Sequence, residues 1–385
     1  MSPELHLPTL GGELETYRLS SSPPTAQTYQ PATSRLAFAA AHVVADPLGD
    51  NAPGAPAVID WDHTLGFRRH LWSLGLSVAE AMDTAQRGMG LDWSATQELI
   101  RRSAAEAPDG RIAVGVGTDQ LPAGNHSLDA VAAAYEEQLA VAEEVGAQPI
   151  LMASRALCAA APSPDDYHKV YGRLLGQSSR PVILHWLGSM FDPALDGYWG
   201  SDSLDVAADV VVDLIDDHTA QVDGIKVSLL DAAKEVALRT RLPVGVRLYT
   251  GDDFNYPELI RGDGSLHSDA LLGIFAAIAP AAAAALKALD DGDLATYDRV
   301  LAPTVPLSRQ IFSAPTYYYK TGIAFLAWLN GHQPGFGMVG GLQTGRSLPH
   351  LAETFRLADA AGVLTKPELA VHRFRQLLVV GGVDA

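Results

Sequence analysis

Residues 222–230 read VDGIKVSLL and place one lysine, Lys226, inside a short apolar run of the kind that forms a strand. The Asp223-Gly224 pair in front of it is typical of a turn. Burying an ammonium group is costly, so a lysine in such a run usually has a partner or a chemical role. Apolar flanks lower the pKa of an amine and can leave it nucleophilic. A lysine that reaches solvent from a strand end is the alternative, and the surrounding pattern has to decide between them.

Short apolar runs alternate with amphipathic helical segments on both sides of Lys226. From Arg35 onward, eight strand-then-helix units occupy about 250 residues. The predicted strands cover residues 35–44, 77–85, 111–117, 148–154, 180–188, 222–230, 243–251 and 263–269. Continuous apolar strands form parallel sheets covered by helices. Eight such units fit a closed (β/α)₈ TIM barrel better than an open doubly wound sheet. No G-x-G-x-x-G motif follows the first strand, so a nucleotide-binding Rossmann fold is less favoured.

The pattern divides the chain into three parts. Residues 1–33 are rich in Ser, Thr and Pro, which predicts an N-terminal arm or short hairpin outside the core. Residues 34–290 form the predicted barrel domain, with the alanine-rich segment 271–289 as a helix that completes it. Residues 291–385 read as helix after helix and predict a C-terminal helical extension.

Composition narrows the function classes. The net charge of −18 is spread along the chain, which disfavours nucleic acid and anionic membranes as partners. Cys158 is the only cysteine, so neither an internal disulfide nor a cysteine-based metal site can form. The first residues lack the pattern of a secretion signal, and no apolar run reaches the length of a membrane span. We therefore expect a soluble, cytoplasmic protein.

Polar residues at the ends of the predicted strands are the candidates for chemistry, because TIM-barrel active sites lie at the carboxyl ends of the strands. Lys226 and His185 are the candidate catalytic residues. The candidate substrate contacts are Asp83, Gln86, Thr118, Tyr249, Asp252, Asp253 and His267.

The order of several motifs resembles the dihydrodipicolinate synthase and N-acetylneuraminate lyase superfamily. These motifs are RIAVGVGTD, PVILHWLG, DGIKVS with Lys226, and the GDD of YTGDDF. The phrases AEAMDTAQRGMGLDW, YTGDDFNYPELI and YYYKTGIAFLAWLNGHQ look like an actinobacterial group named only as dihydrodipicolinate-synthase-like. The resemblance covers roughly residues 35–330. It implies a class I aldolase or lyase in which Lys226 forms a Schiff base with a carbonyl substrate. It also implies that no metal cofactor is needed and that the protein assembles as a homodimer or homotetramer.

Two departures from the superfamily pattern bear on the substrate. The superfamily usually carries a tyrosine on the fifth strand, and His185 stands at the matching position. A histidine there could shuttle a proton, while a core histidine bonded to a backbone carbonyl is the alternative. The carboxylate-binding G-T-T-G-E loop is replaced by DTAQRGMG, in which Asp83 would repel a carboxylate while Gln86 or Arg87 could bind hydroxyls or an anion. We therefore expect a keto sugar or 2-oxo sugar acid, and a role in carbohydrate metabolism, rather than pyruvate.

Two other classes of function remain open from the sequence. A metal-dependent isomerase or hydrolase on the same barrel would take N and O ligands from several strand ends. Its candidate ligands are Asp60, Asp62, His63, His185, Asp252, Asp253 and His267. A barrel that only binds a ligand is the third class, and no partner-binding motif supports it.

Overall fold

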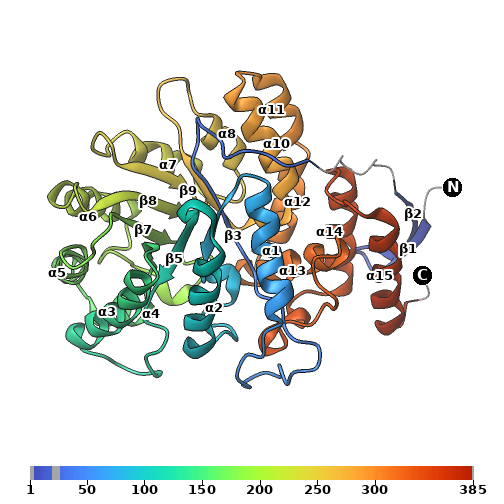
Figure 1. Ribbon diagram of the computed structural model, residues 1–385, viewed down its shortest axis with the longest axis horizontal. Helices are drawn as coiled ribbons and strands as arrows, with labels where there is room; N and C mark the ends of the chain where they lie inside the picture. The colour runs from blue at the N-terminus through green and yellow to red at the C-terminus, as the bar shows by residue number, and fades with distance from the viewer. Residues whose placement is uncertain (1–3, 20–26, 384–385) are drawn as a thin grey trace.

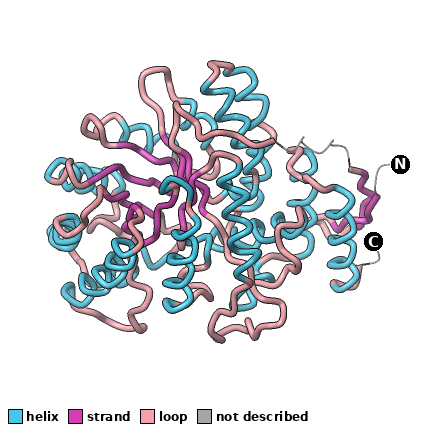
Figure 2. Tube along the Cα trace, viewed as in Figure 1, coloured by secondary structure: helices cyan, strands magenta, loops and turns pink. Residues whose placement is uncertain are grey.

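Eight parallel strands close into a barrel in the computed structural model, which describes residues 4–19 and 27–383. Around the barrel the strand order is β10-β3-β4-β5-β6-β7-β8-β9, and Figure 2 shows the strands gathered inside a ring of helices. The strands are β3 (Ala37–Ala40), β4 (Ser77–Glu80), β5 (Ile112–Val116), β6 (Gln148–Leu151), β7 (Val182–Leu187), β8 (Val222–Ser228), β9 (Arg247–Thr250) and β10 (Asp269–Leu272). This confirms the predicted (β/α)₈ barrel.

Several helices around the barrel begin at a residue whose side chain caps the first turn. Asp92 accepts a hydrogen bond from the backbone N–H of Ala95 at 2.9 Å, and Ser163 forms a capping box with Asp166. The helices around the barrel are α1 (Trp61–Ser73), α2 (Trp93–Glu106), α3 (Leu128–Glu144), α4 (Arg155–Ala160), α5 (Pro164–Leu175), α6 (Leu204–Asp217), α7 (Ala232–Arg239), α8 (Tyr256–Arg261), α9 (Ile274–Ala277) and α10 (Ala279–Asp290). The short α4 was not predicted, although Ser154 caps it by accepting from the N–H of Leu157 at 3.0 Å.

The prediction for the eighth strand was wrong. Residues 263–268 form a loop because Asp263 Oδ1 accepts hydrogen bonds from the N–H groups of Ser265 and Leu266 and from the Ser265 hydroxyl. Such an aspartate turn competes with strand pairing. The strand is instead the apolar DALL of β10, whose last two residues are the first two of the predicted helix 271–289.

Apolar side chains fill the barrel interior as a packed core rather than a pore. They come from most of the strands and include Phe38, Ala79, Ala113, Ile150, Ile183, Tyr249 and Leu271. Ile225 and Val227 pack instead into the layer between strands and helices. Because side chains alternate along a strand, Lys226 faces the interior.

The remaining helices form an extension beside the barrel, which Figure 1 shows in orange and red. They are α11 (Leu294–Leu301), α12 (Thr304–Ile311), α13 (Tyr319–Leu329), α14 (Leu348–Ala360) and α15 (Pro367–Val380). All 11 residues of α13 are buried, and α13 packs against α9, α14 and α15. No helix in the described residues is long and apolar enough to cross a membrane.

An antiparallel hairpin of β1 (Glu4–Pro8) and β2 (Leu14–Arg18) precedes the barrel. It lies beside α14 and α15, and Leu5 and Leu7 are buried there. The hairpin was expected, but these leucines belong to the core rather than to a solvated arm. Residues 20–26 of the predicted arm lie outside the described residues.

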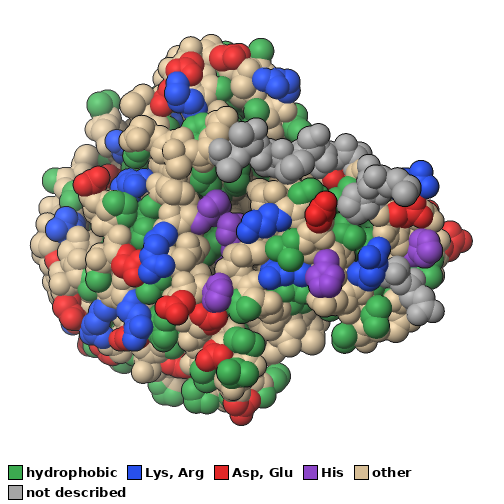
Figure 3. Space-filling view, turned by 45° about the vertical axis from the view of Figure 1, so that its right-hand side comes forward, with side chains coloured by type: hydrophobic (Ala, Val, Ile, Leu, Met, Phe, Trp, Pro, Cys, Tyr) green, Lys and Arg blue, Asp and Glu red, His purple; other side chains and the backbone are tan. Residues whose placement is uncertain are grey.

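The surface carries both signs of charge. On the face shown in Figure 3, acidic and basic side chains are interspersed rather than gathered into one patch. The net charge of −18 is therefore not expressed as a single acidic face in this view.

Candidate active site

Lys226 lines a small cavity near the carboxyl end of β8. The cavity measures about 20 Å³, room for about one water molecule. It is lined by Met82, Asp83, Thr84, Leu187, Phe191, Lys226, Ser228, Asp253, Gly273 and Tyr319. Burial lowers the pKa of Lys226, while the charges of Asp83 and Asp253 oppose that shift. The amine is therefore poised to lose its proton more readily than an exposed lysine.

Asp253 is a proton-holding group in the same cavity. Its Oδ1 accepts a hydrogen bond from the N–H of Ile274 at 2.8 Å. Burial raises the pKa of Asp253 to about 7, against the opposing effects of this hydrogen bond and of Lys226. A carboxyl group with such a pKa can give and take a proton near neutral pH.

His185 lies next to Lys226 across the β7–β8 pairing and is fully buried. Burial, and then the Lys226 charge, lower the pKa of His185 well below its usual value, so the ring is neutral. Its Nε2 is 3.4 Å from Ser228 Oγ, and its Nδ1 has no hydrogen-bond partner among the described residues. The backbone carbonyl expected for a purely structural histidine is therefore not seen there. Ser228 also lines the cavity, so its hydroxyl connects His185 to that space.

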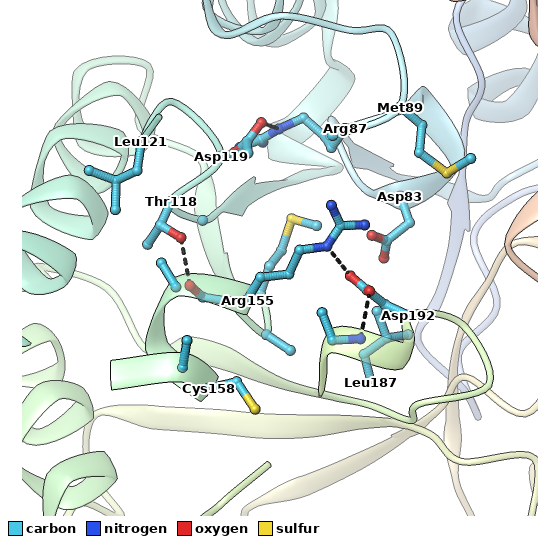
Figure 4. Close-up of a pocket in the computed structure, with 18 of the residues that line it drawn as sticks. Asp83, Arg87, Met89, Thr118, Asp119, Leu121, Arg155, Cys158, Leu187 and Asp192 are labelled. Atoms are coloured by element: carbon cyan, nitrogen blue, oxygen red, sulfur yellow. Dashed lines mark hydrogen bonds and ion pairs between the residues drawn. The ribbon is translucent and has the colours of Figure 1, made fainter. Parts of the chain in front are cut away.

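A larger pocket of about 770 Å³ opens beside this cavity, over the ends of β4, β5, β6 and β7. Asp83, Leu187, Phe191 and Tyr319 line both spaces. Figure 4 shows Thr118 on one wall and Asp83 on the other, with Arg155 reaching across between them. Thr118 Oγ1 and Ser154 Oγ are 2.6 Å apart. The shared side chains lie between the large pocket and the Lys226 cavity.

Arg87, considered as an anion-binding group, is occupied within the protein. It bonds to both carboxylate oxygens of Asp119, to Gln138, and to the carbonyls of Ala81 and Gly115 at 3.1 and 3.2 Å. These contacts use all five of its N–H donors. Burial works to raise the pKa of Asp119, but Arg87 and Gln138 bring it below its usual value. The pair therefore clamps the loops after β4 and β5 together.

Four of the predicted contacts do not line either space in the described part of the chain. Gln86 donates to the carbonyls of Met89 and Val339, and Asp252 accepts from Phe254 and Asn255 in a turn. The Tyr249 hydroxyl donates to Asp223 at the start of β8, so it lies at the opposite end of the barrel from the site. His267 precedes β10 instead of following a strand. Of the predicted residues, Asp83, Lys226 and Asp253 line the small cavity, Asp83 and Thr118 line the large pocket, and His185 lies behind Ser228.

The metal-dependent alternative requires several ligand side chains close together. Over residues 4–19 and 27–383, no three His, Cys, Asp or Glu side chains are placed to hold a metal ion. His63 Nδ1 instead pairs with Asp60 Oδ2 at 2.7 Å at the start of α1. Asp252 accepts hydrogen bonds within a turn and His267 lies in the loop before β10, so neither of these candidate ligands lines the Lys226 cavity.

Several lining residues were missed from the sequence, and Lys320 is the most informative. It is 3% exposed, belongs to α13, and lines the large pocket. Burial lowers the pKa of Lys320 to about 8, while Asp83 and Asp192 oppose that shift. A lone lysine in the apolar run KTGIAFLAWL was the available signal, but nothing in the sequence placed that helix at the barrel.

The Lys320→Met variant should melt at a higher temperature than the native protein at pH 7, by roughly 2–4 °C, because it removes a buried charge. The native unfolded state keeps its Lys320 proton up to about 10.5, whereas the folded state loses it above about 8. Native stability therefore rises with pH between these values, and the difference between the proteins should shrink. Thermal melts from pH 7 to 10.5 would measure it. A variant that melts lower at pH 7 would show that Lys320 stabilises the fold.

The comparisons with known proteins agree on the fold. The dihydrodipicolinate synthase of Aquifex aeolicus superposes with a TM-score of 0.65 at 14% identity, covering 86% of this chain and 99% of that one. The enzyme of that name from Thermotoga maritima gives 0.62 at 15% identity, covering 86% and 100%. The one from Bacteroides thetaiotaomicron gives 0.64 at 13% identity, covering 85% and 99%. At such identities the likeness shows the fold alone.

No curated protein sequence matches the chain. A family model described as "Protein of unknown function (DUF993)" matches residues 5–383, so the chain belongs to the DUF993 family and has the barrel of dihydrodipicolinate synthase.

Proposed function

We propose that the protein is a Schiff-base-forming lyase or aldolase of the class I type, with Lys226 as its nucleophile. The observation that carries this proposal is a buried lysine amine in a cavity at the carboxyl end of a barrel strand. Two carboxylates, Asp83 and Asp253, act on it electrostatically. Their charges favour the protonated amine, but burial outweighs them and lowers the pKa of Lys226, and within the described residues Lys226 forms no ion pair.

The proposed chemistry begins when the neutral Lys226 amine attacks a ketone carbon. The nitrogen–carbon bond forms, the carbonyl oxygen leaves as water, and the resulting protonated imine draws electrons from the neighbouring carbon. A carbon–carbon bond one atom further on can then break or form. Asp253, which lines the same cavity, would supply the proton for water loss and take one from the substrate. Ser228 would link the cavity to His185 as a second proton path.

Asp83 supports a hydroxylated ketone as the substrate. It lines both the Lys226 cavity and the large pocket. A carboxylate there accepts hydrogen bonds from hydroxyls and repels an acidic group attached directly to the carbonyl carbon. We therefore favour a keto sugar over a simple 2-oxo acid such as pyruvate. We also expect a homodimer or homotetramer, which sedimentation of the purified protein would test.

Reductive trapping tests the proposal directly. The protein would be incubated with borohydride and dihydroxyacetone, fructose, pyruvate or a 2-oxo sugar acid, and its intact mass and proteolytic peptides measured. We expect an added mass on Lys226, formed faster with a hydroxy ketone than with pyruvate. An adduct on another lysine, or no adduct with any ketone, would overturn the assignment.

Gly251, directly after β9, gives Lys226 its space. A Cβ at this position would lie 2.2 Å from Ser228 Oγ and 2.8 Å from Lys226 Cε. Gly251→Ala should therefore move the amine and slow trapping on the order of 100-fold. Gly66→Ala, on α1 where a Cβ meets nothing within 4 Å, is the control and should trap at the native rate. Equal rates for the two variants would show that the lysine position is not critical.

A further inference from the structure

Lys320 is a second buried amine, and it faces the large pocket rather than the Lys226 cavity. Its Nζ donates to the carbonyl of Tyr317 at 3.1 Å and lies 3.5 Å from Met89 Sδ. In the described part of the chain it forms no ion pair. A lysine that is 3% exposed and lacks a paired carboxylate is unusual, because buried charges are normally paired.

The position of Lys320 on its helix adds to this cost. It is the second residue of α13, where the helix dipole presents its positive end. The nearby Arg155 repels it, and Asp83 and Asp192 attract it without pairing. A cation is kept here against the dipole and against a like charge, at the wall of a pocket of about 770 Å³. An anion in that pocket would satisfy the lysine, the dipole and the neighbouring arginine together.

Arg155 is the second cation on the wall of this pocket. Its Nε donates to Asp192 Oδ2, and its side chain reaches across the pocket in Figure 4. Its terminal amino groups have no hydrogen-bond partner among the described residues, and the side chain is 59% exposed. Arg155 therefore keeps donors available to a bound molecule, unlike Arg87.

We propose that Lys320, assisted by Arg155, binds an acidic group of the substrate, a carboxylate or a phosphate, at a distance from the carbonyl carbon. Lys320 lines only the large pocket, Lys226 lines only the small cavity, and Asp83 lines both. Asp83 repels an acidic group beside the substrate's carbonyl carbon, and Lys320 binds an acidic group further along the substrate. The substrate class is then a hydroxylated ketone with a terminal acidic group. That the substrate carries a carbonyl rests on the function proposed above, whereas the anion site is inferred from Lys320 and Arg155 alone.

Matched pairs of ketones test the site. Dihydroxyacetone and its phosphate differ by a phosphate, and 2-pentanone and 4-oxopentanoate differ by a carboxylate. Borohydride trapping at Lys226 should be at least tenfold faster for one or both of the anionic members in the native protein. Lys320→Met should lose that preference, so that each anionic ketone is trapped no faster than its neutral partner. Whether the phosphate or the carboxylate pair shows the effect identifies the anion.

Two further variants separate binding from structure. Lys320→Arg keeps the charge and should keep part of the preference. Lys287→Met removes an exposed lysine paired with Asp291 and should behave as native. A native protein without any preference, or a Lys320→Met variant that retains it, would overturn the proposal.

If no ketone is trapped, the lyase proposal fails and the anion site is still tested. Calorimetric titration with inorganic phosphate and with 4-oxopentanoate would be compared for native protein and Lys320→Met. Binding that weakens at least tenfold in the variant would support the site without the Schiff base. Absence of binding by the native protein, or equal binding by both proteins, would overturn it.

Discussion

Lys226→Met should abolish adduct formation with every ketone that the native protein traps. A thioether cannot form an imine, and methionine fills nearly the same space, so the cavity and the fold should persist. Turnover of any ketone substrate should fall on the order of 10⁴- to 10⁶-fold, as expected when a nucleophile is removed. Intact-mass measurement after borohydride reduction, together with a rate assay, would show both effects.

Lys234→Met is the matched control for this prediction. Lys234 is a partly exposed lysine on α7, paired with Asp205, and its loss should leave trapping unchanged. Lys320 provides a sharper discrimination, because it is the other buried amine near the site. If Lys226→Met still forms an adduct and the mass maps to Lys320, the nucleophile has been assigned to the wrong lysine.

Glu80→Gln should lower the free energy of unfolding by about 3–5 kcal/mol, because it leaves a buried arginine without its counter-charge. Arg68 on α1 binds both oxygens of Glu80 at 2.8 Å, and both side chains are 0% exposed. Glu80 Oε1 also accepts from the N–H of Ala81, in the turn that leads to Asp83. Urea denaturation would measure the loss, and the weakened turn should also slow trapping at Lys226.

Glu106→Gln controls for the loss of an arginine–carboxylate pair as such. Arg69, the next residue on α1, binds Glu106 with the same two-bond geometry, but these side chains are 56% and 31% exposed. Loss of this exposed pair in Glu106→Gln should lower the free energy of unfolding by at most about 1 kcal/mol. A double variant, Arg68→Met with Glu80→Leu, should recover most of the lost stability, because no unpaired charge remains. Similar losses for Glu80→Gln and Glu106→Gln would contradict the argument from burial.

The barrel could be predicted because its strands are continuous apolar runs, and that pattern places Lys226 on a strand. The position of the eighth strand could not be predicted, because DGSLHSD and DALL are both short segments that could form a strand. The hydrogen bonds of the Asp263 side chain, which hold DGSLHSD in a loop, are seen in the structure and not in the sequence. Asp252 and Asp253 are adjacent in sequence and equal in chemistry. One caps a turn and the other lines the cavity, a distinction that depends on backbone direction.

Lys320 could not be predicted as a site residue for a different reason. Its helix follows the last barrel strand by almost fifty residues, and no local pattern says where such a helix docks. Its position at the mouth follows from tertiary packing of α13 against α9 and its neighbours. Sequence periodicity shows that a helix is buried, but not which cavity its polar residue will face.

The hairpin at the start of the chain has a consequence for how the protein is made. Arg356 donates to the carbonyl of Leu7, a residue 349 positions earlier, and Arg375 donates to that of Glu4. During synthesis the hairpin leaves the ribosome long before α14 and α15 exist, so its apolar leucines wait without a partner. Folding of this region must therefore wait until α14 and α15 have been synthesised. A product that stops short of these helices would expose Leu5 and Leu7 and be prone to aggregation or proteolysis.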